Sequence, residues 1–222
     1  EAELPQVIDR LRTTQGLEPV MVLSHFSCAD VPEQEAYTQD QVRRFTAMSD
    51  ALQEVFPEIK RSLCNTAGTI GRPEAHFEIC RPGISLYGGN PFTGTAWQDK
   101  GARLGLEWAM SVSAPIIEVR EVAEGRSVSY GRLFTAQKPA TVAVVAIGYA
   151  TAFNRSLSTR TAMIINGRRV PQVGRVCMGM IMADVTGLPP VRVGDTAWLV
   201  GGPAEPGQTP VTPQDIADSL GT

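Results

Sequence analysis

The sequence has no excess of charge and no long apolar run, and each absence excludes a class of partner. Its 222 residues contain 20 Lys and Arg against 23 Asp and Glu, so the net charge of -3 leaves no cationic surplus for nucleic acid or anionic lipid. No apolar stretch reaches the roughly eighteen residues that span a bilayer. The beginning, EAELPQVIDR, is acidic and amphipathic, whereas a signal peptide is basic and then apolar. We therefore expect a cytoplasmic protein that binds neither nucleic acid nor a membrane.

Metal ligands and paired cysteines are scarce as well. The chain has two histidines and four cysteines, and no two cysteines form a C-x-x-C pair. This spacing argues against a zinc ribbon and against a small disulfide scaffold. The acidic residues show neither H-E-x-x-H nor EF-hand spacing. We expect reduced thiols and no metal site.

Residues 1–95 alternate short apolar runs with helical patterns. The run PVMVLSHF at 19–26 is typical of a buried strand, and apolar residues between 39 and 56 recur at helical spacing. The segments RSLCNT and HFEICRPGISLYG follow. Such alternation predicts parallel β/α units, whose functional groups gather at the carboxyl ends of the strands. Because a closed eight-unit barrel needs roughly 250 residues, we expect part of a barrel or an open α/β layer.

Residues 105–222 have a different pattern, because alternating or β-branched runs follow one another with no helix between them. The runs are EWAMSVSAPIIEVREV, RSVSYG, ATVAVVAIGYA, TAMIINGRRVPQVG, VCMGMIMADVT and DTAWLVGG. They predict an all-β, barrel-like domain that follows a turn-rich linker near 91–104, so the fold class is α/β plus all-β. Helical patterns stand at both ends of the chain, which begins with Glu1. We expect it to be a piece of a longer protein.

Two polar residues of the first domain stand where a parallel α/β layer places its chemistry. His25 ends the first strand pattern. There it is either a functional group or a structural polar residue whose hydrogen bonds are all made within the protein. Arg81 emerges from a buried run just before Pro82 and Gly83. Its guanidinium suits an anion or an acceptor nitrogen, or it pairs with a structural carboxylate such as Glu78.

The other candidates are ambiguous when taken singly. Asn65 and Thr66 open a loop whose small residues let a phosphate approach the backbone, although most such strings are ordinary turns. Tyr130, in SVSYGR, is a candidate base where cations or hydrogen bonds favour the phenolate, and otherwise a core aromatic residue. Tyr149 and Met178 have the same two interpretations.

Taken in order, eight strings of the chain resemble the C-terminal two thirds of an alanine racemase. They are SHFSCAD, the Q-x-x-x-F of Gln41 to Phe45, CNTAG, ICRPGISLYGGNPF, VSYGR, AIGYA with Arg155 following, VPQVGRVCM and MADVT. Each string alone is weak evidence for the family, whereas the eight strings in this order are specific to it. Enzymes of this family carry pyridoxal 5′-phosphate (PLP). The resemblance implies a partial, PLP-binding TIM barrel at 1–95 and a C-terminal β domain at 105–222.

The resemblance also implies a cofactor site. In that family an arginine at the position of Arg81 donates a hydrogen bond to the pyridine nitrogen of PLP. Because a guanidinium keeps its proton, the pyridine stays unprotonated and is a weaker electron sink, which favours reprotonation at Cα over transamination. The implied cofactor-binding residues are His25, Asn65, Thr66, Arg81, Gly83 and Ile84.

Racemisation needs one base on each face of the substrate Cα. The family uses the cofactor lysine and a tyrosine of the partner subunit, and Tyr130 stands at the position of that tyrosine. His25 is implied to link Tyr130 to Arg81, which makes these three the catalytic set. The implied substrate-binding residues are Tyr130, Met178 through its N–H, Tyr149 and Arg155. The resemblance therefore also implies a homodimer that acts on the amino acid alanine and supplies D-alanine for peptidoglycan.

The chain departs from the family pattern in two ways. None of its lysines, Lys60, Lys100 and Lys138, lies in the motif of the Schiff-base lysine, so we expect this chain alone to be inactive. Thr151 and Gly179 stand where the family commonly has carboxylates, which opens room for another amino acid such as serine. The alternatives are a non-catalytic PLP-fold binding module and an acid–base enzyme that uses His25 and Tyr130 without a cofactor.

Overall fold

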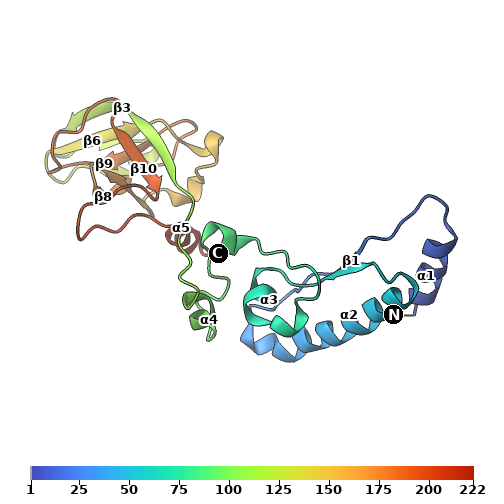
Figure 1. Cartoon of the computed structure of the whole chain (residues 1–222). Coiled ribbons are helices and arrows are strands. Elements are labelled where there is room, and N and C mark those ends of the chain that lie inside the picture. Colours follow the sequence, from blue (N-terminus) through green and yellow to red (C-terminus); the bar gives the residue numbers. More distant parts are fainter. Residues whose placement is uncertain (1) are drawn as a thin grey trace. The chain divides into compact units, whose positions relative to one another are not determined.

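The computed structural model describes residues 2–222 (Figure 1). It divides into two compact units, with the boundary between Ala109 and Met110. The first contains two parallel strands with helices, and the second contains a closed antiparallel barrel. The fold class predicted from the sequence is therefore confirmed. Within residues 2–222 no helix is both long enough and apolar enough to cross a membrane.

The first unit repeats a strand and a helix twice. Strands β1 and β2 are parallel, with Leu23 opposite Ser62, so their carboxyl ends lie together. The α-helices and strands are α1 (Leu4–Thr13), β1 (Met21–Leu23), α2 (Glu35–Val55), β2 (Lys60–Ser62), α3 (Thr66–Gly71) and α4 (Gln98–Ala102). Three 3-10 helices lie between them, η1 (Pro32–Gln34), η2 (Pro73–Ala75) and η3 (Ile84–Tyr87).

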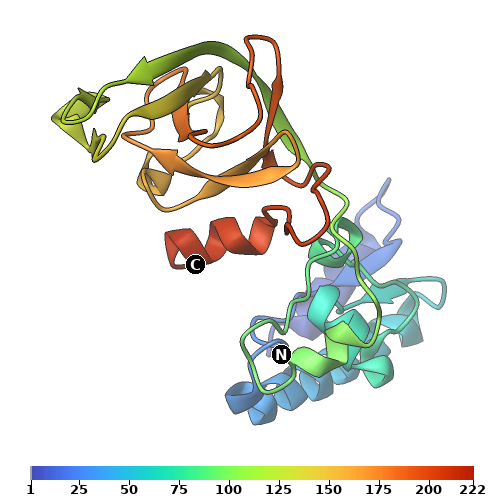
Figure 2. The same cartoon turned by 90° about the vertical axis from the view of Figure 1, so that its left-hand side faces the viewer.

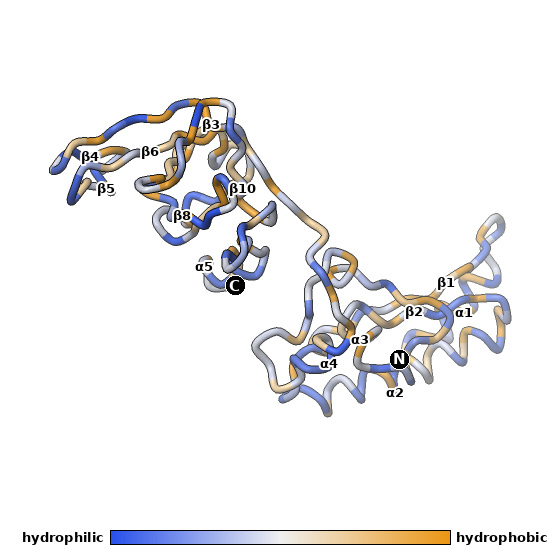
Figure 3. Tube along the Cα trace, turned by 60° about the vertical axis from the view of Figure 1, so that its left-hand side comes forward, coloured by the Kyte–Doolittle hydropathy of each residue, from blue (hydrophilic) through white to orange (hydrophobic). Residues whose placement is uncertain are grey.

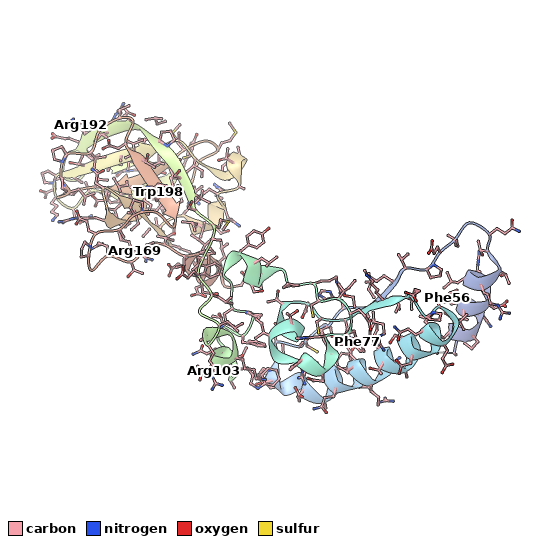
Figure 4. The ribbon with its side chains drawn as sticks, in the orientation of Figure 1. Phe56, Phe77, Arg103, Arg169, Arg192 and Trp198 are labelled. Carbon is pink, nitrogen blue, oxygen red and sulfur yellow. The ribbon has the colours of Figure 1, made fainter. Side chains whose placement is uncertain are left out.

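The core of the first unit packs one face of α2 against the segments that follow the strands. Phe45 and Leu52 of α2 are buried, and the ring of Phe45 meets that of Phe77 edge-on at 5.2 Å between centroids (Figure 4). Phe26 fills the space over α3 because Gly68 has no side chain there. A Cβ at Gly68 would lie 2.7 Å from the Phe26 ring, so glycine permits this close approach.

A buried thiol belongs to the same core. All four cysteines are free, and Cys64 is fully buried. Burial raises the pKa of the Cys64 thiol to about 12. A thiol that keeps its proton in this way is a poor nucleophile, and the Cys64 thiol donates to the carbonyl of Ala75 at 3.1 Å.

An ion pair joins the strand layer to the segment after α3. The guanidinium of Arg61 donates to both carboxylate oxygens of Glu78, at 3.1 and 2.8 Å, and to Asp50 at 2.9 Å. It also lies over the Phe77 ring, 4.8 Å from its centroid. Hydrogen bonding from Arg61 lowers the pKa of Glu78, so the folded state favours the ionised carboxylate.

Glu78→Gln is expected to destabilise the chain by at most about 1 kcal/mol at neutral pH, because the carboxylate is partly exposed and water screens the pair. Folding lowers the pKa of Glu78. The contribution of Glu78 to the free energy of unfolding is therefore present above the ordinary pKa of a glutamate and is lost as the pH falls through the lowered pKa. Urea unfolding at pH 7 and pH 3 tests this, with Glu58→Gln, which has no ion pair in the described part of the chain, as control. A difference from wild type that persists unchanged at pH 3 contradicts the ion-pair explanation.

The second unit is a six-stranded barrel with the order β10-β3-β6-β9-β8-β7, in which all pairs are antiparallel. The inward residues are aliphatic, and Figure 3 shows the apolar colour along these strands. A separate hairpin carries β4 and β5. The strands are β3 (Val112–Val122), β4 (Ser127–Val128), β5 (Phe134–Thr135), β6 (Ala140–Val145), β7 (Ala162–Ile165), β8 (Arg168–Val173), β9 (Ile181–Asp184) and β10 (Thr196–Val200).

Helix α5 (Pro213–Leu220) lies along the barrel (Figure 2). It begins with a capping box, in which Thr212 accepts from the N–H of Asp215 and Asp215 accepts from the N–H of Thr212. Ile216 and Leu220 pack against the barrel core. Gly221, at φ +75°, caps its carboxyl end.

Several predicted strands are shorter in the structure, among them β1, which spans only Met21–Leu23 of the run at 19–26 and is largely exposed, not buried as predicted. The run that starts at Glu107 becomes a strand only at Val112. The run VCMGMIMADVT becomes a strand only at Ile181, because the N–H of Cys177 donates to the carbonyl of Met180 at 3.0 Å and closes a turn. This turn bears on function, since it forms one wall of the cavity described below.

Candidate functional site

Arg81 lies across the carboxyl ends of β1 and β2. Its guanidinium donates to Ser62 Oγ at 2.5 Å and to the Ser24 carbonyl at 2.6 Å, and so reaches the end of each strand. Its backbone N–H donates to the Cys64 carbonyl at 2.9 Å. The side chain is therefore held by neutral oxygens on both sides and has a fixed direction.

The alternative pairing of Arg81 with Glu78 is wrong. Glu78 bonds to Arg61 through both of its oxygens. Among residues 2–222 no carboxylate lies within ion-pair distance of Arg81. An arginine held only by neutral groups retains an uncompensated positive charge, which suits an acceptor atom of a ligand.

The structure brings His25 to Arg81, as the sequence predicted. The guanidinium lies 3.3 Å from His25 Nδ1. Because arginine only donates, Nδ1 must accept, and the proton of the neutral ring is then on Nε2. The amide nitrogen of Asn65 lies 3.4 Å from Nε2, and it donates to the carbonyl of Phe26 at 3.3 Å. His25 is exposed, so its Nε2–H is available to an external acceptor.

A set of hydrogen-bond donors lies at the start of α3 and η3. Asn65 caps α3, accepting from the N–H of Gly68 at 3.0 Å. Thr66 Oγ1 accepts from the N–H of Gly83 at 2.7 Å, so its own hydroxyl proton is left to donate elsewhere. The N–H of Ile84 begins η3 and has no acceptor among the described residues. The hydroxyl of Thr66 and the N–H of Ile84 together suit a phosphate group, and the bond from Gly83 fixes the position of Thr66.

The second unit contains the other predicted residues in one cavity. It has a volume of about 790 Å³. Its lining includes all four predicted substrate residues, which come from three separate segments: Tyr130, Tyr149, Arg155 and Met178, together with Val176, Cys177, Gly179 and Met180. The predicted residues therefore form two groups, one in each unit.

Backbone hydrogen bonds fix the wall of this cavity. The N–H groups of Tyr149 and Ala150 donate to the carbonyls of Cys177 and Met178, at 3.0 and 2.9 Å. The N–H of Met178 has no partner among residues 2–222. It is available for a ligand carboxylate, as the sequence comparison predicted. Gly148 permits the approach, since a Cβ there would lie 2.3 Å from the Cys177 carbonyl oxygen.

Gly148→Ala is expected to destabilise the chain by about 3 kcal/mol, at the top of the range for adding a methyl group to tight packing. The atoms that it meets are backbone carbonyls, which cannot rotate away as a side chain would. Thermal unfolding of the chain measures the effect. Gly179→Ala is the matched control, because a Cβ at Gly179 meets no atom within 4 Å. Equal melting temperatures for the two variants contradict the packing argument.

The three lysines lie in different surroundings, two in the first unit and one in the second. Lys60 begins β2, at the end of the strand opposite to the site. Lys100 Nζ lies 3.9 Å from the centroid of the Trp97 ring. Lys138 lines a different cavity, of about 400 Å³, in the second unit.

The sequence analysis missed three residues that shape these sites. Ser62, the acceptor for Arg81, is fully buried at the end of β2. A polar residue in a buried strand run was the available signal. Ser24 acts through its carbonyl and Gly148 through its lack of a side chain, so neither gives a signal in side-chain chemistry.

Comparison with known proteins identifies the family. The alanine racemase N-terminal domain family matches residues 1–91, and the alanine racemase C-terminal domain family matches residues 109–222. Alanine racemase from Nitratidesulfovibrio vulgaris, strain Miyazaki F, is 46% identical over the whole chain, which covers 58% of that relative. Alanine racemase from Lawsonia intracellularis is 38% identical over 97% of the chain and 56% of the relative. The chain thus spans little more than half the length of these relatives.

Solved structures agree with these matches. The biosynthetic alanine racemase of Pseudomonas aeruginosa superposes with a TM-score of 0.77 at 35% identity, over 100% of this chain and 57% of that one. The alanine racemase of Clostridium difficile 630 in complex with cycloserine superposes with a TM-score of 0.85 at 30% identity, over 100% and 56%. With both family domains matched in order and the fold in agreement, the chain belongs to the alanine racemase family.

Proposed function

We propose that this chain is part of a PLP-dependent alanine racemase that interconverts L- and D-alanine. The observation that carries the proposal is the guanidinium of Arg81, held by neutral oxygens across the carboxyl ends of two parallel strands. A cation without a carboxylate partner suits the unprotonated nitrogen of a pyridine ring. A cytoplasmic role in supplying D-alanine for peptidoglycan is part of the same proposal.

The donors of the first unit fit PLP. Its phosphate is a dianion that needs several donors, and Thr66 and Ile84 offer a hydroxyl proton and a backbone N–H, while Gly83 fixes the position of Thr66 through its own N–H. Its pyridine nitrogen needs one donor, which Arg81 offers. Asn65 contributes by capping α3 and so fixing the position of Thr66. The set contains donors for both ends of the cofactor.

When bound, PLP withdraws electrons from the substrate and so makes its Cα proton acidic. Arg81 limits this effect, because its guanidinium does not transfer a proton to the ring. The lysine that carries PLP in this family is proposed to come from outside these 222 residues, since none of Lys60, Lys100 and Lys138 lies in the motif of that lysine. This chain alone is therefore expected to be inactive.

Tyr130 is the proposed base on one face of Cα. We place it in the site of a second copy of the protein, so that the working unit is a homodimer. The phenolate oxygen would accept from the Nε2–H of His25, whose tautomer is fixed by Arg81. In the same cavity the N–H of Met178 binds the substrate carboxylate, and Tyr149 and Arg155 line the entrance.

The test of this proposal is racemisation by the PLP-loaded protein that carries this chain. L-alanine should become D-alanine, detected with a D-amino-acid oxidase, and PLP titration should show binding. Binding of PLP without turnover of any amino acid supports a non-catalytic module in place of a racemase. Turnover without PLP supports an acid–base enzyme that uses His25 and Tyr130.

One observation favours a racemase with a broader substrate range. Gly179 lines the cavity, and the space beside its Cα is open to at least 4 Å. Gly179→Asp is expected to lower kcat/KM for serine about tenfold more than for alanine, since filling a pocket by a few atoms costs on the order of 1–3 kcal/mol for the larger ligand. Gly179→Ala is the control with a smaller side chain. Equal losses for the two substrates contradict this view of the cavity.

A further inference from the structure

The turn that carries Tyr130 has an unusual backbone. Ser129 has φ +76° and ψ 165°, a conformation that residues other than glycine rarely adopt. Gly131 and Arg132 also have positive φ, at +71° and +53°. The N–H of Arg132 donates to the Ser129 carbonyl at 3.1 Å and closes the turn. Tyr130 is at its tip and 72% exposed, so packing of the phenol ring contributes little to its position.

Two hydrogen bonds compensate for the conformation of Ser129. Its hydroxyl oxygen accepts from the N–H of Arg175 at 2.7 Å and its proton is donated to the carbonyl of Arg175 at 3.3 Å. The turn of Tyr130 and the segment at 174–175 pack closely here. A Cβ at Gly174 would lie 2.6 Å from Ser129 Cβ. One small hydroxyl side chain thus ties the turn of Tyr130 to the segment at 174–175.

That segment is in turn fixed to the barrel by Gln172. Gln172 is 2% exposed and lies in β8. Its amide donates to the carbonyls of Val173 and Gly174, at 2.7 and 2.9 Å, and accepts from the N–H of Thr159 at 2.5 Å. All hydrogen-bonding atoms of this buried amide group are engaged. The anchor of Ser129 is therefore a rigid part of the fold.

The anchored segment also continues into the cavity wall. Val176 follows Arg175, and its N–H donates to Ser158 Oγ at 3.0 Å, while Ser158 Oγ donates to the Arg155 carbonyl at 2.6 Å. Cys177 and Met178 come next and hold Tyr149 and Ala150 through their carbonyls. One continuous segment, 174–178, therefore forms part of the cavity wall and holds the two other segments that line the cavity.

We propose that Ser129 is a positioning residue that fixes the direction of the Tyr130 phenol relative to the substrate groups on segment 174–178. This inference rests on the proposed function, in which Tyr130 exchanges the Cα proton. Proton transfer requires the donor and acceptor atoms to be at hydrogen-bonding distance, and a displacement of about 1 Å costs on the order of 10²-fold in rate. Without the two bonds to Arg175, the turn can relax to ordinary φ values, and the phenol moves with it.

Three variants separate the hydrogen bonds from the backbone strain. Both Ser129→Ala and Ser129→Gly remove the two bonds, but alanine disfavours the positive φ and so drives the turn to relax, whereas glycine tolerates it. Ser127→Ala is the matched control on the same hairpin. Its hydroxyl contacts Thr135 and Arg132, and it makes no bond to segment 174–178 in the described part of the chain.

The kinetic test uses the PLP-loaded protein that carries this chain, with Cα-deuterated L- and D-alanine. Since the two enantiomers are equally stable, kcat/KM must fall equally in both directions, and we expect a loss of about 10- to 100-fold in Ser129→Ala and Ser129→Gly. The substrate isotope effect should rise only in the direction in which Tyr130 removes the Cα proton, and fall in the other. Isotope effects that stay unchanged, or that change alike in both directions, overturn the proposal.

A second test does not depend on activity. Ring-labelled tyrosine NMR of the chain gives signals for its four tyrosines, and Tyr130→Phe assigns one of them. In Ser129→Ala this signal should sharpen and move to the position of a mobile tyrosine, and in Ser127→Ala it should not. An unchanged Tyr130 signal in Ser129→Ala overturns the positioning role. If the parent protein racemises no amino acid while the Tyr130 signal changes as expected, the proposed function fails and the structural role of Ser129 stands.

Discussion

Replacing Tyr130 by Phe is expected to slow exchange of the Cα proton by about 10²- to 10⁴-fold in the alanine enantiomer from which Tyr130 removes it, the range that a positioned general base contributes. The substitution removes one oxygen atom from a side chain that is 72% exposed, so it leaves no buried cavity and no unsatisfied partner. The melting temperature should therefore stay within about one degree of wild type. Exchange in deuterated water, followed by NMR in the PLP-loaded protein, measures the rate.

Tyr149→Phe is the matched control for this variant, because Tyr149 lines the same cavity. We expect it to change KM more than kcat, since its proposed place is the substrate entrance. A Tyr130→Phe protein that exchanges the proton within threefold of the wild-type rate excludes Tyr130 as a base. Equal kcat losses for both tyrosines would show instead that the cavity needs hydroxyl groups in general.

Replacing Arg81 by Gln is expected to weaken PLP binding by about 10- to 100-fold, since a hydrogen bond from a charged donor contributes roughly 1.5–3 kcal/mol. The fold should tolerate the change, because the buried hydroxyl of Ser62 keeps a partner in the Ile79 carbonyl at 2.8 Å. Racemisation should fall further than binding, since His25 also loses the donor that fixes its tautomer. Absorbance titration with PLP and a racemisation assay measure the two effects separately.

Two further variants give this prediction its controls. Arg81→Lys retains the charge but lacks the planar fork that reaches Ser62 and the Ser24 carbonyl together, so it should restore only part of the affinity. Arg103→Gln changes an exposed arginine of the same unit (Figure 4) and should leave PLP binding unchanged. Arg81→Gln with wild-type affinity for PLP would remove Arg81 from the cofactor site.

The sequence and its family resemblance named residues that the structure brings together, although their roles stay predictions. His25 and Arg81 stood in recognisable strings, and the structure brings them to 3.3 Å. Tyr130, Tyr149 and Met178 likewise line one cavity. Residues that act through the backbone could not be predicted from the sequence, because a positive φ at Ser129 or a close approach at Gly148 depends on segments distant in the chain.

The fold was predictable in class and less so in its boundaries. Alternating runs correctly indicated β/α units and then a barrel. The predicted start of β9 was wrong. VCMGM has apolar residues at strand spacing, but a turn closed by Cys177 and Met180 interrupts the strand there. Local composition does not reveal such a turn, since its hydrogen bond competes with strand pairing only in the folded barrel.

The central claim is that this chain supplies Arg81 and Tyr130 to a racemase site whose lysine lies elsewhere. The most direct measurement is exchange of the alanine Cα proton in deuterated water with added PLP, for the chain alone and for the chain mixed with a polypeptide that supplies a lysine-bearing barrel half. The account predicts exchange only in the mixture, and its loss when the chain carries Tyr130→Phe. Exchange by the chain alone, or exchange in the mixture that is indifferent to Tyr130→Phe, would contradict it.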